Sequence, residues 1–272
     1  MGKLKPNLKP LNGRVGEVTF YWRQGSLVAR TRHNGSKPAM PTERQMESQM
    51  RWRNLINLWN AFPPHHRPQY ENSRYGMTNY NIFISYGMQA EPVYLTRYEA
   101  VNRACVLNTV MLSVGTLPEI AVTHDGTAPA TDIVLGGLTV DGDTTVGQLS
   151  EAIVQHNGNY SHGDVIVFYV GYQTTDALLN VPKVEVYCRS IVLTIQDGRR
   201  LWSDGVFQQG FTERGGVLSA ASQVDGGMAW VHVRQSGSHC LRSTQRFVCH
   251  NALVQHYAGR EAFEAACRSY GN

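Results

Sequence analysis

Two adjacent pairs of histidine and cysteine are the residues whose types best match a metal site. They are His239-Cys240 and Cys249-His250, and both side chains are common zinc ligands. Each pair falls in a stretch that we predict to be extended, where neighbouring side chains point to opposite faces of a sheet. Neither pair could then place both members on one ion without a bend, and zinc ribbons usually separate paired ligands by two residues. We therefore expect no metal site and no cofactor.

The sequence motifs of common enzyme classes are missing. It contains no G-x-S-x-G nucleophile elbow, no G-x-x-x-x-G-K-[ST] phosphate loop and no H-E-x-x-H zinc helix. Several acidic residues fall at expected turns, among them Asp125, Asp141, Asp143 and Asp164, and turn chemistry accounts for them. A catalytic carboxylate pair among them is the less favoured alternative. We expect a protein that is not an enzyme.

Basic and aromatic residues are interleaved near the N-terminus, in the stretch GRVGEVTFYWRQGSLVARTR. Apolar Val18, Phe20 and Trp22 alternate with other residues, and Gln24-Gly25-Ser26 is typical of a turn, which together predict a β-hairpin. An isolated hairpin is only marginally stable in water, so it must pack on something. We interpret six of its residues as a partner-binding surface: Arg14, Phe20, Trp22, Arg23, Arg30 and Arg32.

Two kinds of partner suit this hairpin. Arginines beside aromatic rings hold nucleic acid through phosphate contacts and base stacking. Against this, Phe20 and Trp22 alternate as the packing face of a strand does, which favours a protein partner. We favour contacts with further copies of the chain and with other structural proteins, and keep nucleic-acid binding as the alternative. A carbohydrate-binding sandwich is a third reading, which would need coplanar, exposed aromatic rings.

The charge distribution supports an arm that meets an acidic partner. Residues 1–74 carry 13 Lys or Arg and 4 Asp or Glu, a net charge of +9, whereas residues 75–272 carry 12 and 17, a net charge of −5. A basic first quarter is therefore complementary to nucleic acid or to the acidic body of a neighbouring copy.

Helical signals follow the hairpin. Residues 1–12 contain two prolines and read as an extended arm, and NGSKPAMP reads as a linker. Thr42 and Gln45 form a capping-box pattern that opens a helix to about Phe62. Its apolar stripe consists of Met46, Met50, Leu55, Leu58, Trp59 and Phe62. A second short helix is expected after Thr78, which is suited to be its N-cap.

From about residue 93 the apolar period changes to two, which indicates strands. We expect them at 104–113, 133–138, 165–172, 184–195, 228–235 and 240–250, with one embedded helix at 146–156 and a last helix at 261–268. The predicted fold is mainly β of the α+β class. Residues 1–92 would form a hairpin-plus-helices module, and residues 93–272 a β-sandwich or barrel-like body.

The sequence shows no signal for a membrane or for export. No stretch reaches the roughly 18 apolar residues of a membrane span, and the basic start has no apolar segment of a signal peptide. Five scattered cysteines do not form a disulfide framework and are expected to be free thiols. We expect no membrane contact and assembly in the cytoplasm.

Several segments carry a resemblance to a known family. The hairpin stretch, the helix start KPAMPTERQMESQMRWRNLINLWNAF and the later pieces TNYNIFISYG, PVYLTRYEA, SVGTLPEI, TVGQLSEAI and RSYG resemble a family of uncharacterised proteins of Bacteroides-type bacteria and their phages. These motifs are structural, and the resemblance supplies no site residues. It implies a phage or prophage setting, and hence a virion structural protein that assembles into a symmetric oligomer.

Overall fold

The computed structural model of the protein describes residues 13–23, 26–31, 41–71, 77–124, 126–202 and 205–271. The chain divides into two compact units, Met1–Pro41 and Thr42–Asn272. The boundary predicted at residue 92 does not coincide with this division. Helical residues Leu55 and Phe83 share one hydrophobic core with Val231 of the sheet, so the helices belong to the same unit as the β-rich body.

The first unit is a small antiparallel sheet, as the sequence predicts. Its strands are β1 (Gly13–Val15), β2 (Val18–Arg23) and β3 (Ser26–Thr31), in the order β1-β2-β3. The pairing of β2 with β3 confirms the hairpin, and β1 is an additional strand. The predicted arm, most of the linker and the turn residues Gln24 and Gly25 lie outside the described residues.

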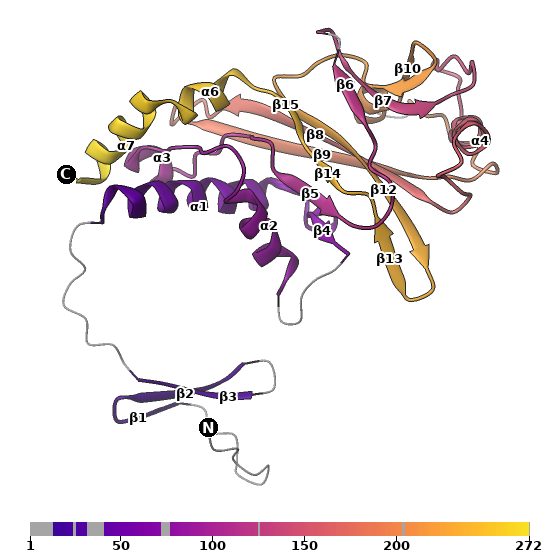
Figure 1. The fold of residues 1–272 in the computed structure, drawn as a ribbon. Helices are drawn as coiled ribbons and strands as arrows, with labels where there is room; N and C mark the ends of the chain where they lie inside the picture. The colour runs from indigo at the N-terminus through magenta and orange to yellow at the C-terminus, as the bar shows by residue number, and fades with distance from the viewer. Residues whose placement is uncertain are drawn as a thin grey trace. The chain divides into compact units, whose positions relative to one another are not determined.

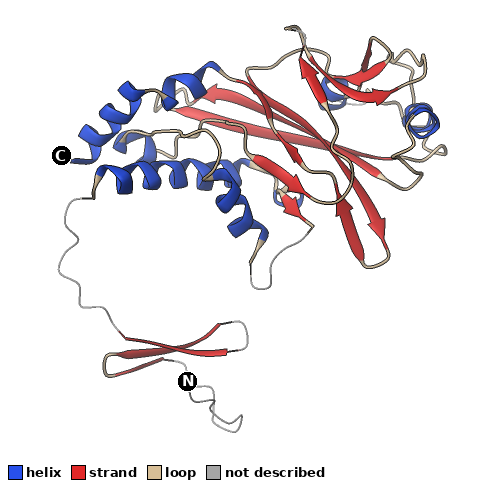
Figure 2. Cartoon of the chain, in the orientation of Figure 1, coloured by secondary structure: helices blue, strands red, loops and turns tan. Residues whose placement is uncertain are grey.

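A five-stranded sheet forms the centre of the second unit (Figures 1 and 2). Long antiparallel strands dominate it, and β8 lies between β9 and β12. The far edge of β12 pairs with two short strands, one at each end. The five are β8 (Val165–Thr175), β9 (Pro182–Val192), β12 (Gly226–Ser236), β13 (His239–Arg242) and β15 (Val248–His250).

Both faces of this sheet contribute to hydrophobic cores, because its side chains alternate between two of them. On one face, Val167 and Val231 pack with α1 (Glu43–Ala61) and α2 (Asn79–Gly87). On the other face, Phe168 and Trp230 pack with helices and a second sheet. These elements are α4 (Val146–His156), α5 (Gly205–Gly210), β6 (Val122–His124), β7 (Pro129–Val134), β10 (Thr212–Arg214) and β11 (Val217–Ser219). The body is therefore an α+β sandwich.

A third, three-stranded sheet joins distant parts of the chain. Its strand order is β14 (Gln245–Arg246), β5 (Met111–Val114) and β4 (Gln69–Tyr70). The Glu71 carboxylate reinforces it by accepting hydrogen bonds from the backbone N–H of Thr116 at 2.9 Å and of Arg242 at 3.1 Å. The remaining helices are the 3-10 turn Pro64–His66, α3 (Arg97–Val101), α6 (Ala252–Ala258) and α7 (Arg260–Gly271). Within the described ranges, no helix has the length and apolar character needed to cross a bilayer.

The helix starts confirm the sequence predictions. The Thr42 hydroxyl accepts a hydrogen bond from the Gln45 N–H, and the Gln45 side-chain carbonyl accepts one from the Thr42 N–H, which makes the expected capping box. Thr78 caps α2 in the same way with one bond. The embedded helix expected at 146–156 is α4, and Thr145 caps it in a second capping box with Gln148. The predicted apolar stripe of α1 is buried throughout.

Three strand predictions need correction. In the predicted strand 104–113, only Met111–Val114 is β. The preceding segment is buried and forms no ladder with any described strand. Its Cys105 N–H donates to the Pro182 carbonyl at 2.8 Å. Asn54 exchanges two hydrogen bonds with Val106 (2.8 and 2.9 Å), and Gln173 accepts one from the Leu107 N–H (3.0 Å). The strand expected at 133–138 ends at Val134 because Gly136 and Gly137 turn the chain at φ +59° and +88°. The stretch 240–250 breaks into three short strands.

Candidate functional site

The predicted partner-binding residues divide between the two faces of the small sheet. Arg14 and Arg30 are both paired with Thr19, so they share its face. Phe20 and Trp22 lie on the opposite face. Phe20 is half-buried, and 49% of Trp22 is exposed. Arg23 ends β2, and Arg32 lies outside the described residues.

This arrangement separates Arg14 and Arg30 from Phe20 and Trp22, which lie on the opposite face. A single-strand binder combines cations and stacking rings on one groove, and of the three rings of β2, Tyr21 alone shares the face of Arg14 and Arg30. The apolar face is suited to packing against protein. The Arg14 side chain is also used locally, because its Nε donates a hydrogen bond to the Gly16 carbonyl at 2.8 Å.

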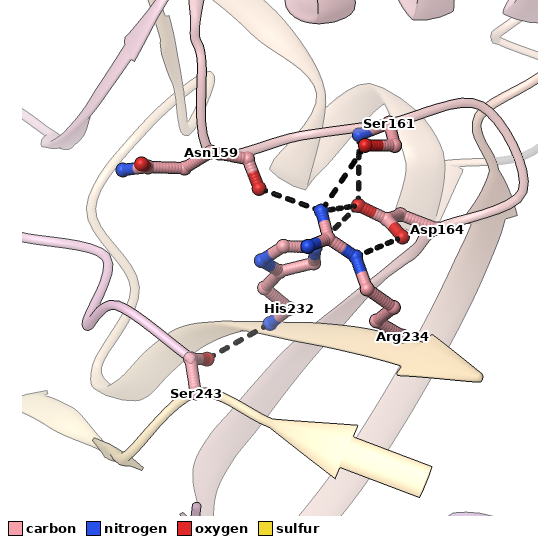
Figure 3. Close-up of polar contacts among 6 residues, drawn as sticks. All are labelled: Asn159, Ser161, Asp164, His232, Arg234 and Ser243. Carbon is pink, nitrogen blue, oxygen red and sulfur yellow. Dashed lines mark hydrogen bonds and ion pairs between the residues drawn. The ribbon is translucent and has the colours of Figure 1, made fainter. Parts of the chain in front are cut away.

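A buried charge cluster lies in the second unit (Figure 3). The Asp164 carboxylate, at the start of β8, accepts hydrogen bonds from Arg234 Nε (2.8 Å) and Nη2 (2.6 Å), from His232 Nε2 (2.8 Å) and from the Ser161 N–H (2.9 Å). The Asp164 and His232 side chains are 4% and 1% exposed. The Arg234 Nη2 also donates to the Asn159 carbonyl at 2.8 Å. The cluster ties the loop before β8 to strand β12.

The pKa shifts of Asp164 and His232 indicate the charge state of each side chain in this cluster. Burial favours a raised pKa for the Asp164 carboxyl, but the hydrogen bonds from Arg234, His232 and Ser161 outweigh it, and the pKa is lowered. Burial lowers the pKa of His232 despite the neighbouring Asp164 carboxylate. The stable state is therefore a neutral imidazole that donates to a carboxylate, whose charge Arg234 compensates.

The His232 ring is held by contacts with two side chains of the second unit. The ring has Asp164 at its Nε2 and the Tyr160 ring against it, with 4.4 Å between the ring centroids and 32° between the ring planes. Within the described part of the chain, no serine or cysteine side chain is hydrogen-bonded to this ring. Ser243 contacts His232 only at the backbone, where its Oγ accepts from the N–H at 2.9 Å. The sequence predicted only a turn role for Asp164. The signal that could have found its partners is the spacing of His232 and Arg234, which lie two residues apart and so share one face of β12.

The two histidine–cysteine pairs cannot share a metal ion. Cys240 is opposite Gln235 and Cys249 is opposite Gly227 on the same strand β12. Eight residues of strand separate these positions, a distance of about 27 Å at ~3.4 Å per residue. All five cysteines are free thiols, two of them buried and three half-buried. Burial raises the pKa of Cys188 to about 11, which makes this thiol unreactive.

A hollow of about 870 Å³ lies between α1, α3 and the start of β9. We call it the basic groove. Its lining includes the cations Arg53, Arg97, Arg103 and Lys183, the ring of Trp52, and the amides of Gln49, Asn57 and Asn60, and it includes no Asp or Glu. Sequence reasoning missed it, because its cations come from separate segments that only the fold brings together.

Comparisons with protein-family models, with curated proteins and with solved structures found no match. The functional argument therefore depends on the geometry of the chain itself.

Proposed function

We propose that the protein is a non-enzymatic structural subunit that assembles with further copies of itself, and with other structural proteins of a phage virion, through its N-terminal hairpin. The observation that carries this proposal is that the hairpin unit has no core of its own. The first unit by itself buries none of residues 13–22 or 26–31, although they include Phe20, Tyr21, Trp22, Leu27 and Val28. A sheet of three short strands without a buried face is marginal in water, so a partner surface is needed to stabilise it.

Charge supports a second copy as that partner. Residues 1–41 contain eight Lys or Arg and one Glu, a net charge of +7. The other 17 basic and 20 acidic residues give residues 42–272 a net charge of −3. Opposite net charges attract two copies at long range and orient their encounter, while the apolar face supplies the contact that holds them.

The second unit offers a matching surface, which we call the tyrosine groove. It is a hollow of about 540 Å³ on the sheet face near α5, and its lining includes Tyr172, Tyr187 and Val224. The lining residues with a charge are the carboxylates of Glu185 and Asp225. Tyr187 is 43% exposed, and its hydroxyl donates a hydrogen bond to Glu185 at 3.1 Å. An apolar groove with an acidic rim suits an aromatic, arginine-bearing hairpin.

The test compares the two faces of the hairpin. The double change Phe20→Ser and Trp22→Ser should convert the oligomer to monomers while the melting temperature of the second unit stays unchanged. Loss of two aromatic contacts at an interface weakens association by at least about 30-fold. The matched control is Ile195→Ser, which removes an apolar side chain of similar exposure, 54%. Oligomeric state is measured by light scattering during size-exclusion chromatography.

The alternative of nucleic-acid binding predicts a different result. Under it, Arg14→Gln and Arg30→Gln would lower the salt slope of DNA or RNA binding by roughly one for each lost phosphate contact. If the intact chain is monomeric, or if the Phe20 and Trp22 variant assembles normally, the assembly proposal is wrong. Tight nucleic-acid binding at physiological salt that depends on Arg14 and Arg30 would favour the alternative instead.

A further inference from the structure

The basic groove of the second unit gathers positive charge, and its described lining residues include no Asp or Glu. The side chains of Arg53 and Arg103 make no hydrogen bond or ion pair with any described residue. Lys183 Nζ donates to the Asn102 carbonyl at 2.7 Å and the Arg103 carbonyl at 3.2 Å, and neutral carbonyls do not cancel its charge. A hollow lined by charges of one sign concentrates the field and attracts a ligand of opposite sign.

The backbone at Arg103 ends α3 and places the Arg103 side chain in the lining of the groove. Arg103 has φ +57°, the left-handed conformation that non-glycine residues rarely adopt. It follows α3, and the next N–H, of Ala104, donates back to the Glu99 carbonyl at 2.8 Å. Glycine is the usual residue at such a helix end because it has no Cβ. An arginine there costs stability, and its side chain lines the groove.

An exposed aromatic ring lies in the same groove. Trp52 is on α1 and is 44% exposed. It shares the groove-facing side of this helix with Gln49, Arg53, Ile56 and Asn60, at spacings of three and four residues. A flat exposed ring stacks a nucleobase, arginine and lysine bind its phosphate, and side-chain amides can bond to base edges. The volume of about 870 Å³ is also within the range of small-ligand sites.

We propose that the basic groove binds a nucleotide unit, with the base stacked on Trp52 and the phosphate held by Arg53, Arg103 and Lys183. This chemistry has two sources, a free nucleotide and one residue of a single-stranded nucleic acid. The site is separate from the hairpin in sequence, so it does not depend on the assembly role.

The experiment measures binding of two probes to the intact chain. One is adenosine 5′-monophosphate, followed by calorimetry; the other is a fluorescent eight-nucleotide oligothymidylate, followed by anisotropy at about 50 and 200 mM salt. Trp52→Ala should weaken binding about 5- to 100-fold through loss of stacking. The double change Arg53→Gln and Arg103→Gly should lower the salt slope for the oligonucleotide by about 1.4, since each single-strand phosphate contact contributes about 0.7.

Controls separate the groove from general charge and from the hairpin. Arg200→Gln removes an exposed cation far from the groove in sequence, where it pairs with Asp143 at 2.9 Å, and should leave binding unchanged. Thermal melting checks folding, and Arg103→Gly is expected to fold well because glycine suits the left-handed backbone. Binding of both probes would identify a free nucleotide as sufficient, and binding of the oligonucleotide alone would identify a strand.

Three results would overturn the proposal. The first is that neither probe binds the intact chain. The second is that the groove variants bind the oligonucleotide as the wild type does, while Arg14→Gln and Arg30→Gln abolish binding. The third combines two observations: a hexaglutamate peptide displaces the oligonucleotide as effectively as unlabelled oligonucleotide does, and Trp52→Ala leaves oligonucleotide binding unchanged. Together they would identify an acidic peptide as the ligand.

Discussion

Replacing Asp164 with asparagine tests whether the buried charge cluster stabilises the second unit. Its Oδ2 accepts from Arg234 Nη2, His232 Nε2 and the Ser161 N–H, and its Oδ1 accepts from Arg234 Nε. Asparagine has nearly the same shape but offers only one acceptor oxygen, and its NH2 group only donates. In either orientation of the amide, at least one donor of the cluster then faces another donor.

The expected loss of stability follows from burial. Removing the charge of one partner in a buried ion pair costs about 3–5 kcal/mol, because the other charge stays without compensation. The Arg234 side chain is 32% exposed, so water compensates part of its charge. We therefore expect a loss near the lower limit, about 3 kcal/mol, which lowers the melting temperature of a unit of this size by about 6–12 °C.

The pH dependence gives a second measure of the same carboxylate. Because the folded pKa of Asp164 is below its usual 3.8, its contribution to stability is fully present above about pH 4 and is lost as pH falls through the folded value. The difference in stability between wild type and Asp164→Asn should therefore shrink as pH falls below about 4. The folded pKa of His232 is below its usual value of 6.5, so both proteins also lose stability through His232 as pH falls below about 6.5. Wild type and Asp164→Asn are therefore compared with each other at each pH.

The assay is thermal unfolding followed by circular dichroism, with Asp143→Asn as the control. Asp143 also pairs with an arginine, Arg200, but its side chain is 83% exposed, so its variant should melt as the wild type does. The reasoning is refuted if Asp164→Asn melts within about 2 °C of the wild type at neutral pH.

Two further predictions concern the helix start and metal. Thr42→Ala should destabilise the second unit by about 1 kcal/mol, because α1 loses its N-cap acceptor and half of the capping box; unchanged urea unfolding of Thr42→Ala combined with Gln45→Ala would contradict this. The purified protein should contain no stoichiometric zinc and should keep its melting temperature in chelator, because Cys240 and Cys249 pair with distant positions on β12; elemental analysis that finds about one zinc per chain would show that a site exists elsewhere.

Local signals in the sequence were enough to place much of the fold. Capping boxes fix helix starts through contacts three residues apart, so Thr42 and Thr145 could be recognised directly. The long strands were also predictable, because their residues alternate between two apolar cores. The hairpin followed from its alternation and turn residues, and the pairing of β2 with β3 confirms it, with Ser26 already in the ladder opposite Arg23.

Features that depend on distant residues could not be predicted in this way. The segment before β5 has the composition of a strand, but beyond Cys105 the side-chain amides of Asn54 and Gln173 take the place of a paired strand at the N–H groups of Val106 and Leu107. Asp164 looked like a turn residue because its ion-pair partner Arg234 comes 70 residues later. The domain boundary was misplaced because a change of apolar period at residue 93 marks a change of secondary structure, and the core extends across it.

The third sheet determines when the second unit can complete its fold during synthesis. Gln69 and Gln245 are both paired with Ser113, on opposite edges of β5. At 5–20 residues per second, a ribosome needs roughly 9–35 s to proceed from the first of these residues to the last, whereas a hairpin forms within about 10 μs. The N-terminal strands are therefore available long before their own body is finished. Under the proposed assembly role, a nascent chain would dock onto copies already completed, so growth would proceed by addition of new chains to finished ones.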